Sequence, residues 1–265
     1  MNLRGWVVVV ALFALITGAS LDVATLIVAN TIDYVKTLDS SLLTVTGSTQ
    51  QIITSDEVKW TGNFSRETPA NDLKGGYSQM KKDFDLVSKY LSDQGVSENE
   101  ITISPVMMNP IYNNCAAALK FPEAKLGAAP NQAGCVNEIV SYRLVQNVEV
   151  NSGDVNKITK VAQDLSPLID QGVVFSTQRL EYYYTKLPDL RVKLLAAATK
   201  DAQARAEQIA ASTGEKLGHL MSENTGVIQI TPVNSTQISD AGTYDTSTIE
   251  KQITAVVRAQ FTLNH

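Results

Sequence analysis

The chain has few of the residues that most enzymes and metalloproteins use in their sites. Its 265 residues include two cysteines, two histidines and 6% aromatic residues. Neither His219 nor His265 has a second histidine or a cysteine at ligand spacing, so the sequence predicts no metal site. A glycine-rich phosphate loop and a nucleophile elbow are also missing. We therefore predict that the protein binds no cofactor and is not an enzyme.

Charge is sparse and evenly spread. The formal net charge is −5 and there is no basic run, which argues against nucleic-acid binding. Three carboxylate pairs occur in predicted turns or on polar strand faces, and we interpret them as solvated surface: Asp56 with Glu57, Glu98 with Glu100, and Asp240 with Asp245. The last pair does not have the spacing of an EF-hand loop, so it does not predict calcium binding.

The N-terminus carries the one long hydrophobic run. Residues 6–17 (WVVVVALFALIT) are uncharged, and the uncharged stretch 5–21 just reaches the roughly 17 to 25 residues of a membrane-spanning helix. We favour a membrane anchor with a juxtamembrane helix over residues 1–37, with Arg4 on the cytoplasmic side and the rest exported. The alternative is a signal peptide cleaved after the small residues 17–19.

The two cysteines, Cys115 and Cys135, lie in one loop-like stretch. Together with the predicted export, they lead us to predict a disulfide that closes this loop, worth about 3 kcal/mol in the chain-entropy model. The alternative is a pair of unrelated free thiols.

Hydrophobic periodicity is clearest at the C-terminal end. Residues 249–263 alternate apolar and polar, which is typical of a half-buried antiparallel strand. Lys251 is the polar exception on the apolar face, and Val256 is the apolar exception on the polar face. An alanine-rich helix precedes this strand, with Ala198 and Ile209 near one apolar stripe and Gly214 at its end.

The rest of the chain alternates between strand and helix patterns. We expect strands over residues 42–49, 57–65, 101–106, 140–150 and 173–185, and helices that begin at Thr68 and Ser152. Gly47 is expected at a bulge or a turn. Residues 91–96 (LSDQGV) and 168–173 (LIDQGV) match at five of six positions and each ends a helix. The predicted fold class is α+β, with helices packed on one face of a largely antiparallel sheet built from repeated helix–strand units.

Three successive tyrosines follow in the strand over residues 173–185. Tyr182 and Tyr184 would share one face and Tyr183 the other, which makes them candidates for a subunit contact. Ordinary core and edge packing is the alternative.

Several segments together resemble the SIMPL-domain family, specifically its bacterial members with an N-terminal membrane segment. The matching segments are 45–48 (VTGS), 55–60, 90–103 (YLSDQGVSENEITI), 152–155 (SGDV), 196–218 and 249–261. The resemblance implies one SIMPL-like α+β domain over residues 38–265, interrupted by a Cys-bearing insertion at 109–137 that is not typical of the family. It also implies an envelope-associated protein that self-associates, since some relatives form large ring-like or channel-like oligomers. It supplies no catalytic residues.

We therefore expect a single-pass protein of the bacterial inner membrane with its C-terminal domain in the periplasm. Its expected partners are the lipid bilayer and further copies of itself, assembled into an envelope scaffold or compartment. The first alternative is a periplasmic binding module for a small ligand or an envelope protein, which predicts a concave, partly apolar pocket. The second is an enzyme of unrecognised type.

Overall fold

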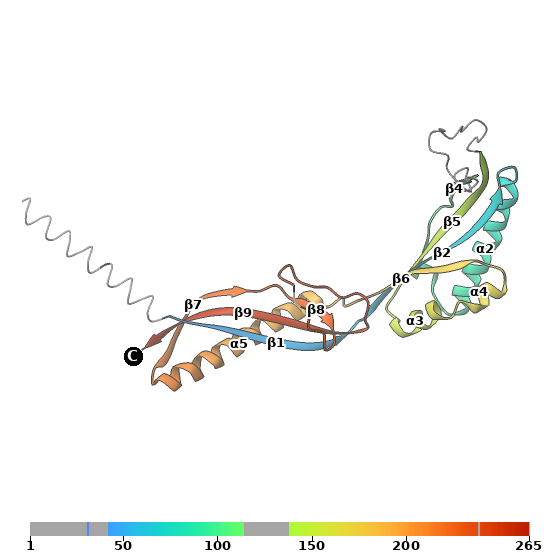
Figure 1. Ribbon diagram of the computed structural model, residues 1–265. Helices are drawn as coiled ribbons and strands as arrows, with labels where there is room; N and C mark the ends of the chain where they lie inside the picture. The colour runs from blue at the N-terminus through green and yellow to red at the C-terminus, as the bar shows by residue number, and fades with distance from the viewer. Residues whose placement is uncertain (1–30, 32–41, 114–137, 238, 265) are drawn as a thin grey trace, which may run out of the picture.

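The computed structural model describes residues 31, 42–113, 138–237 and 239–264, which form two antiparallel sheets, each with helices on one face (Figure 1). The predicted α+β class with antiparallel sheets is confirmed. We call the two units the α5 lobe and the plait lobe. The α5 lobe consists of β1 (Leu42–Thr54), α5 (Leu187–Thr213), β7 (Lys216–Thr225), β8 (Gln229–Pro232) and β9 (Glu250–Asn264). The plait lobe consists of β2 (Glu57–Pro69), α2 (Leu73–Asp93), a short 3-10 turn (Glu98–Glu100), β3 (Ile101–Ile103), β4 (Met107–Tyr112), β5 (Ile139–Ser152), α3 (Val155–Gln163), α4 (Ser166–Asp170) and β6 (Phe175–Tyr183).

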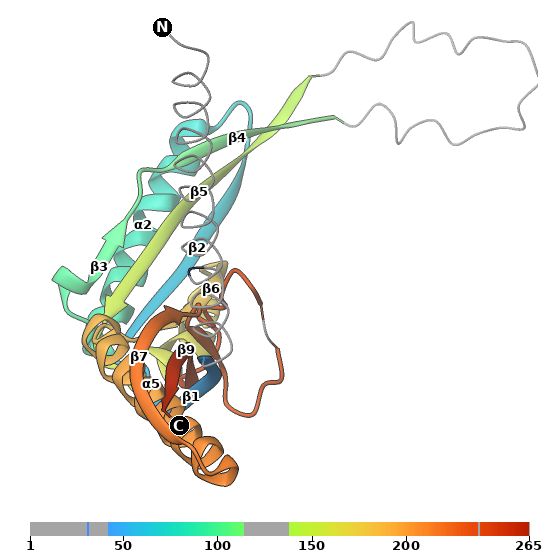
Figure 2. The same cartoon turned by 90° about the vertical axis from the view of Figure 1, so that its left-hand side faces the viewer.

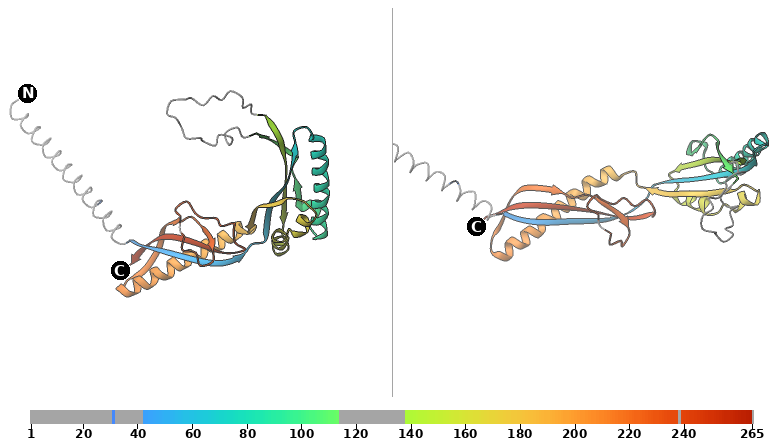
Figure 3. Two further views of the ribbon diagram at one scale, coloured as in Figure 1. Left: turned by 45° about the vertical axis from the view of Figure 1, so that its right-hand side comes forward. Right: turned by 45° about the horizontal axis from the view of Figure 1, so that its top comes forward.

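The two lobes lie end to end, and the chain passes between them where β1 leads into β2 (Figure 3). Hydrogen bonds tie this junction together. The Asp56 carboxylate accepts from the Thr185 backbone N–H at 2.7 Å and from its hydroxyl at 2.9 Å, where the chain returns from β6 to α5. The backbone N–H of Tyr182 donates to the Thr246 carbonyl at 2.8 Å, so the loop before β9 also contacts the plait lobe.

In the α5 lobe, small residues let the helix lie directly on the sheet. Ala198, Ala202 and Ala206 are fully buried against β1 and β9. A side chain at Gly47 would place its Cβ 2.2 Å from the Ala198 carbonyl oxygen, so only glycine fits there. The prediction of a bulge or turn at Gly47 is wrong, because β1 pairs with β9 in unbroken register. Ile209 was expected on the buried stripe but is 43% exposed, because the close approach to the sheet leaves room for Ala206 and Ala210 only.

The plait lobe has β-α-β-β-α-β connectivity and the strand order β3-β5-β2-β6, with β4 also paired to β5. This is the split βαβ, or ferredoxin-like, arrangement. Its core is made of large side chains, and Trp60 and Phe64 are at most 1% exposed. The Phe175 ring lies 5.6 Å from Trp60 and 6.5 Å from Phe64 between ring centroids. The residues of β2 that alternate with these core side chains are polar and half-buried: Lys59, Thr61 and Asn63.

The two matching hexapeptides form the same helix end. Gly95 and Gly172 both have φ near +75° (73° and 78°), the left-handed conformation that favours glycine. In each case the next residue, Val96 or Val173, is buried. Its backbone N–H donates at 3.0 Å to the carbonyl of the leucine at the first position of the hexapeptide. One turn follows α2 and the other follows α4, so each closes the helical part of one half of the plait.

Most strand bounds differ from the predictions by a few residues, and three differences are larger. α2 begins at Leu73 rather than at Thr68, because β2 continues to Pro69 and Asp72 caps the helix, accepting from the Gly75 backbone N–H at 3.1 Å. The single helix expected after Ser152 is broken into α3 and α4, because Pro167 lacks an N–H and its ring clashes with the preceding turn. Residues 107–112 form β4, although 109–137 was expected to be irregular.

Candidate functional site

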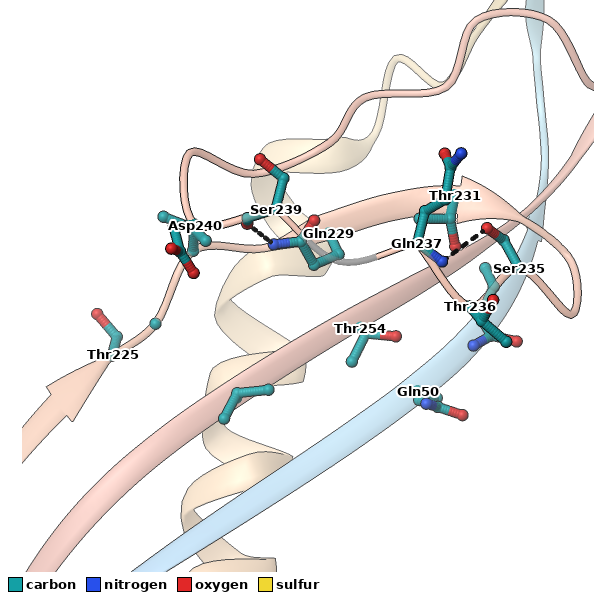
Figure 4. Close-up of a pocket in the computed structure, with 14 residues that line it drawn as sticks. Gln50, Thr225, Gln229, Thr231, Ser235, Thr236, Gln237, Ser239, Asp240 and Thr254 are labelled. Carbon is teal, nitrogen blue, oxygen red and sulfur yellow. Dashed lines mark hydrogen bonds between the residues drawn. The ribbon is translucent and has the colours of Figure 1, made fainter.

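A pocket of about 690 Å³ opens on the α5 lobe, on the sheet face opposite α5 (Figure 4). Its size is within the usual range of small-molecule sites. The lining residues are Gln50, Thr225, Gly226, Val227, Gln229, Thr231, Ser235, Thr236, Gln237, Ser239, Asp240, Gln252, Thr254 and Val256. They come from β1, the end of β7, β8, β9, the short connection between β7 and β8, and the loop that follows β8.

The floor of the pocket is the polar face of the sheet. Thr254 of β9 lies between Gln50 of β1 and Gln229 of β8 in one cross-strand row. In the next row, Gln252 lies beside Thr231 of β8. The alternation of β9 therefore places uncharged hydrogen-bonding side chains side by side on this face, two residues apart along the strand.

The roof of the pocket is formed by residues 235–237 and 239–240 of the loop that follows β8, and residues 243–245 of the same loop are fixed to the sheet. The backbone N–H of Ile230 donates to the Thr243 carbonyl at 2.7 Å, and the N–H of Asp245 donates to the Ile230 carbonyl at 2.9 Å. These bonds occupy the outer edge of β8. Backbone pairing thus anchors the loop to the sheet at residues 243–245, beside the pocket.

A buried ion pair holds the same loop from below. Lys251, the polar exception on the apolar face of β9, is 0% exposed, and its Nζ lies 3.5 Å from Oδ2 of Asp245 and bonds to the Thr248 carbonyl. Burial raises the pKa of Asp245, but hydrogen bonds from Thr248 and Ser247 and the charge of Lys251 outweigh it and lower the pKa to about 2. Burial lowers the pKa of Lys251, and Asp245 opposes that shift. The interpretation of Asp245 as solvated surface is wrong, since its side chain is 8% exposed.

Gln229 is the most unusual residue of the pocket. It is 9% exposed, and its Nε2 donates to the Ser239 carbonyl at 2.6 Å. Its Oε1 is buried, and no group in the described part of the chain donates to it. A buried acceptor without a donor costs about 1 to 3 kcal/mol. The Ser239 carbonyl fixes the amide orientation, because the flipped amide would put two acceptors against each other.

The comparison with known protein families gives one match over most of the chain. The model of the SIMPL family, described as a protein of unknown function (DUF541), matches residues 43–261. The chain belongs to the SIMPL family. No curated protein matches it. The matched region of this SIMPL protein runs from β1 into β9 and includes both lobes and the pocket.

His219, Glu100 and Asp240 of this SIMPL protein have structural or surface positions. His219 is on the exposed part of β7, and its backbone N–H donates to the Thr262 hydroxyl at 2.9 Å. Glu100 accepts from the Ser97 backbone N–H at 2.9 Å and closes a turn. No group of three or more histidine, cysteine, aspartate or glutamate side chains is placed to hold a metal within the described ranges. Asp240 is exposed at the rim of the pocket.

The three tyrosines lie in different surroundings. Tyr182 is 6% exposed in the plait core, with its hydroxyl 3.1 Å from that of Thr159, so it offers little surface to a neighbour. Tyr183 is half-buried, with its ring 6.4 Å from that of Tyr244, and Tyr184 packs against the core of the α5 lobe. A subunit contact through Tyr183 or Tyr184 stays a prediction.

Other predicted features lie outside the described residues. These are the disulfide between Cys115 and Cys135, His265, and the anchor or signal peptide over residues 1–37, apart from Thr31. Within the part of the chain that the structure describes, no helix combines the length and apolar character needed to cross a membrane.

The pocket was not predicted from the sequence. Its one visible signal was Val256, the apolar residue on an otherwise polar strand face, which lines the pocket. The loop over residues 233–249 resembles an ordinary polar connection, because serine, threonine and glutamine are common in any turn.

Proposed function

We propose that this SIMPL protein is an exported, membrane-anchored protein that assembles into a homo-oligomer and serves as an envelope scaffold or compartment. The observation that carries this proposal is an apolar arm formed by β4 and the adjoining start of β5. Figure 2 shows this arm projecting beyond α2 at the edge of the plait lobe.

Large apolar side chains are exposed on both faces of the arm. They are Met107 and Met108 (45% each), Tyr112 (51%), Ile139 (37%) and Val140 (49%). A cluster of large apolar side chains this exposed is typical of an interaction site.

The arm also ends the sheet. β4 pairs with β5 on one side, and no strand in the described ranges pairs with its other side. A second copy of the same arm covers both features at once, because a two-fold axis places identical apolar residues and identical free edges against each other. We therefore assign the arm to contact with another copy of this chain.

The test is the mass of the full-length protein in mild detergent, measured by mass photometry. The expected result is an oligomer at micromolar concentration that dissociates in the double variant Met107→Ser, Val140→Ser, with at least about tenfold weaker association from the lost apolar burial. The matched control is Ile169→Ser, Val192→Ser, which removes apolar side chains that are 61% and 70% exposed elsewhere. A monomeric wild-type protein, or equal loss in both variants, would contradict the proposal.

Two finer features belong to the same proposal. The uncharged run over residues 5–21 would hold the chain in the inner membrane, with both lobes in the periplasm. The two halves of the plait, each with the same glycine turn, would descend from a repeated helix–strand unit. Carbonate extraction of membranes tests the anchor, and release of the full-length chain into the soluble fraction would contradict it.

A second candidate function is ligand binding, which the pocket of the α5 lobe supports. It is concave and partly apolar, with a few convergent polar groups. The test is a thermal-shift screen of the full-length protein and of the pocket variant Gln229→Leu with small uncharged molecules. A ligand that stabilises the wild-type protein but not the variant would support this function.

A further inference from the structure

We propose that the pocket of the α5 lobe binds a neutral sugar. This inference rests on the second proposed function, ligand binding, and specifies its ligand. It follows from the pocket's donors and acceptors, its charge, its apolar patch and the edge of the strand beneath the roof.

The buried amide of Gln229 defines the first requirement. Gln229 lines the pocket, its Nε2 donates to the Ser239 carbonyl, and its Oε1 is a buried acceptor to which no group in the described part of the chain donates. A ligand group that donates an O–H or N–H would complete it. The hydroxyls of Thr254 and Thr231 and the amides of Gln50 and Gln252 both donate and accept, which matches the dual character of sugar hydroxyls.

Charge gives the second requirement. None of the lining residues is a lysine, arginine or histidine, so within the described residues a phosphate or carboxylate would find no counter-charge. The buried Lys251 is paired with Asp245 and does not line the pocket. The one carboxylate in the lining, Asp240, would repel an anion but can accept from two neighbouring hydroxyls of a sugar ring.

The apolar part of the lining gives the third requirement on the ligand. Val227 and Val256 line the pocket beside Gly226, whose backbone N–H donates to the Val256 carbonyl at 2.9 Å and so holds the connection between β7 and β8 against the floor. The result is a small apolar patch beside a polar floor. A pyranose ring has the same pattern, with a C–H face and a rim of hydroxyls.

The edge of β8 argues against a peptide as the ligand. An extended peptide binds a sheet by pairing with a free strand edge. Here the edge of β8 is already occupied by the chain's own loop, through the Ile230–Thr243 and Asp245–Ile230 bonds and a parallel bridge between Ile230 and Tyr244.

The experiment is saturation-transfer difference NMR on the full-length protein. The probes are cellobiose and N,N′-diacetylchitobiose as neutral sugars, glucose 6-phosphate as an anionic sugar, and N-acetyl-trialanine amide as an uncharged peptide. We expect signal from a neutral sugar and none from the anionic sugar or the peptide. Binding should weaken by about tenfold in Asp240→Asn and in Thr254→Val, which each remove one hydrogen-bond group, and further in Gln229→Leu.

The matched control is Thr46→Val, an isosteric change at an exposed position on β1 that does not line the pocket. Should Gln229→Leu fail to fold, the isosteric Thr254→Val keeps the test intact. Equal sugar binding by all variants would place the site elsewhere and overturn the inference. If the peptide or the anionic sugar binds and neither neutral sugar does, the sugar inference is overturned, but the proposed ligand-binding function stands. If no probe binds and Gln229 holds only an ordered water, both the sugar inference and the proposed ligand-binding function are overturned.

Discussion

Both lobes pack helices on an antiparallel sheet, but the side chains between the two layers are small in one lobe and large in the other. The α5 lobe uses glycine and alanine, so that the backbone of α5 lies against β1 at Gly47. The plait lobe uses Trp60, Phe64 and Phe175, which hold the helices away from the sheet by a layer of rings. In one lobe stability depends on space that must stay empty of side chains, and in the other it depends on space that must be filled. Four predictions test or sharpen this difference.

The largest effect is expected in the plait core. Phe64→Ala removes a ring that is 0% exposed and leaves a cavity beside Phe175, which should lower the free energy of unfolding by about 4 kcal/mol. Urea denaturation measures the loss. Amide hydrogen exchange should show it first in β2 and β5, and a first loss of protection in α5 would contradict the separation of the two cores.

The next effect comes from adding a single carbon in the other lobe. In Gly47→Ala the new Cβ would meet the backbone of Ala198 and Ala202, and α5 must move, at a cost of about 3 kcal/mol. The control is Gly153→Ala, where the nearest atom is the Asp56 carbonyl at 3.7 Å and stability should change by less than about 0.5 kcal/mol. Equal stability of the two variants in urea would show that α5 does not pack as closely as described.

A smaller, pH-dependent effect should be confined to the α5 lobe. The folded-state pKa of Asp245 is about 2, below its ordinary value of 3.8, so the stabilisation is complete above pH 4 and is lost as the pH falls towards 2. The loss should be about 2 kcal/mol in the wild-type protein. Asp245→Asn should be less stable at pH 6 and should lack this part of the acid dependence. Chemical denaturation at pH 2, 3, 4 and 6 measures both, and parallel pH curves would refute the role of the ion pair.

The smallest effect should be the same in both lobes. Gly172 of the plait lobe and Gly214 of the α5 lobe end helices with φ of 78° and 82°, and a Cβ added at either position would have no atom within 4 Å. Replacement by alanine should therefore cost only the left-handed strain, about 1 kcal/mol each. Thermal unfolding that gave unequal costs would show that the helix ends, and not only the helix faces, distinguish the lobes.

The sequence was sufficient for features that depend on local pattern. The alternation over residues 249–263 predicted β9, and the glycines at 95, 172 and 214 marked helix ends that all have positive φ. The resemblance to the SIMPL family was confirmed over residues 43–261. These features depend on neighbours in the chain, so a single sequence contains them.

Features that depend on distant partners were missed. Lys251 was a polar residue on an apolar face, and only the fold brings Asp245 beneath the sheet to pair with it. Gly47 needs no side chain because of a helix about 150 residues later in the chain, a separation that no local pattern encodes. The pocket combines β1, β8, β9 and a loop, so its existence depends on the register of strands from both ends of the chain.

The strand order of the α5 lobe also has a consequence for how the protein is made. β9 leaves the ribosome after the other described strands of this lobe, yet it lies between β1 and β7, which do not pair with each other. The plait lobe is continuous from β2 to β6 and has all its strands before α5 is synthesised. During synthesis β1 and α5 therefore lack the strand that both contact until residues 250–264 have been made. A chain that stops before Glu250 has a complete plait lobe and an α5 lobe without its central strand.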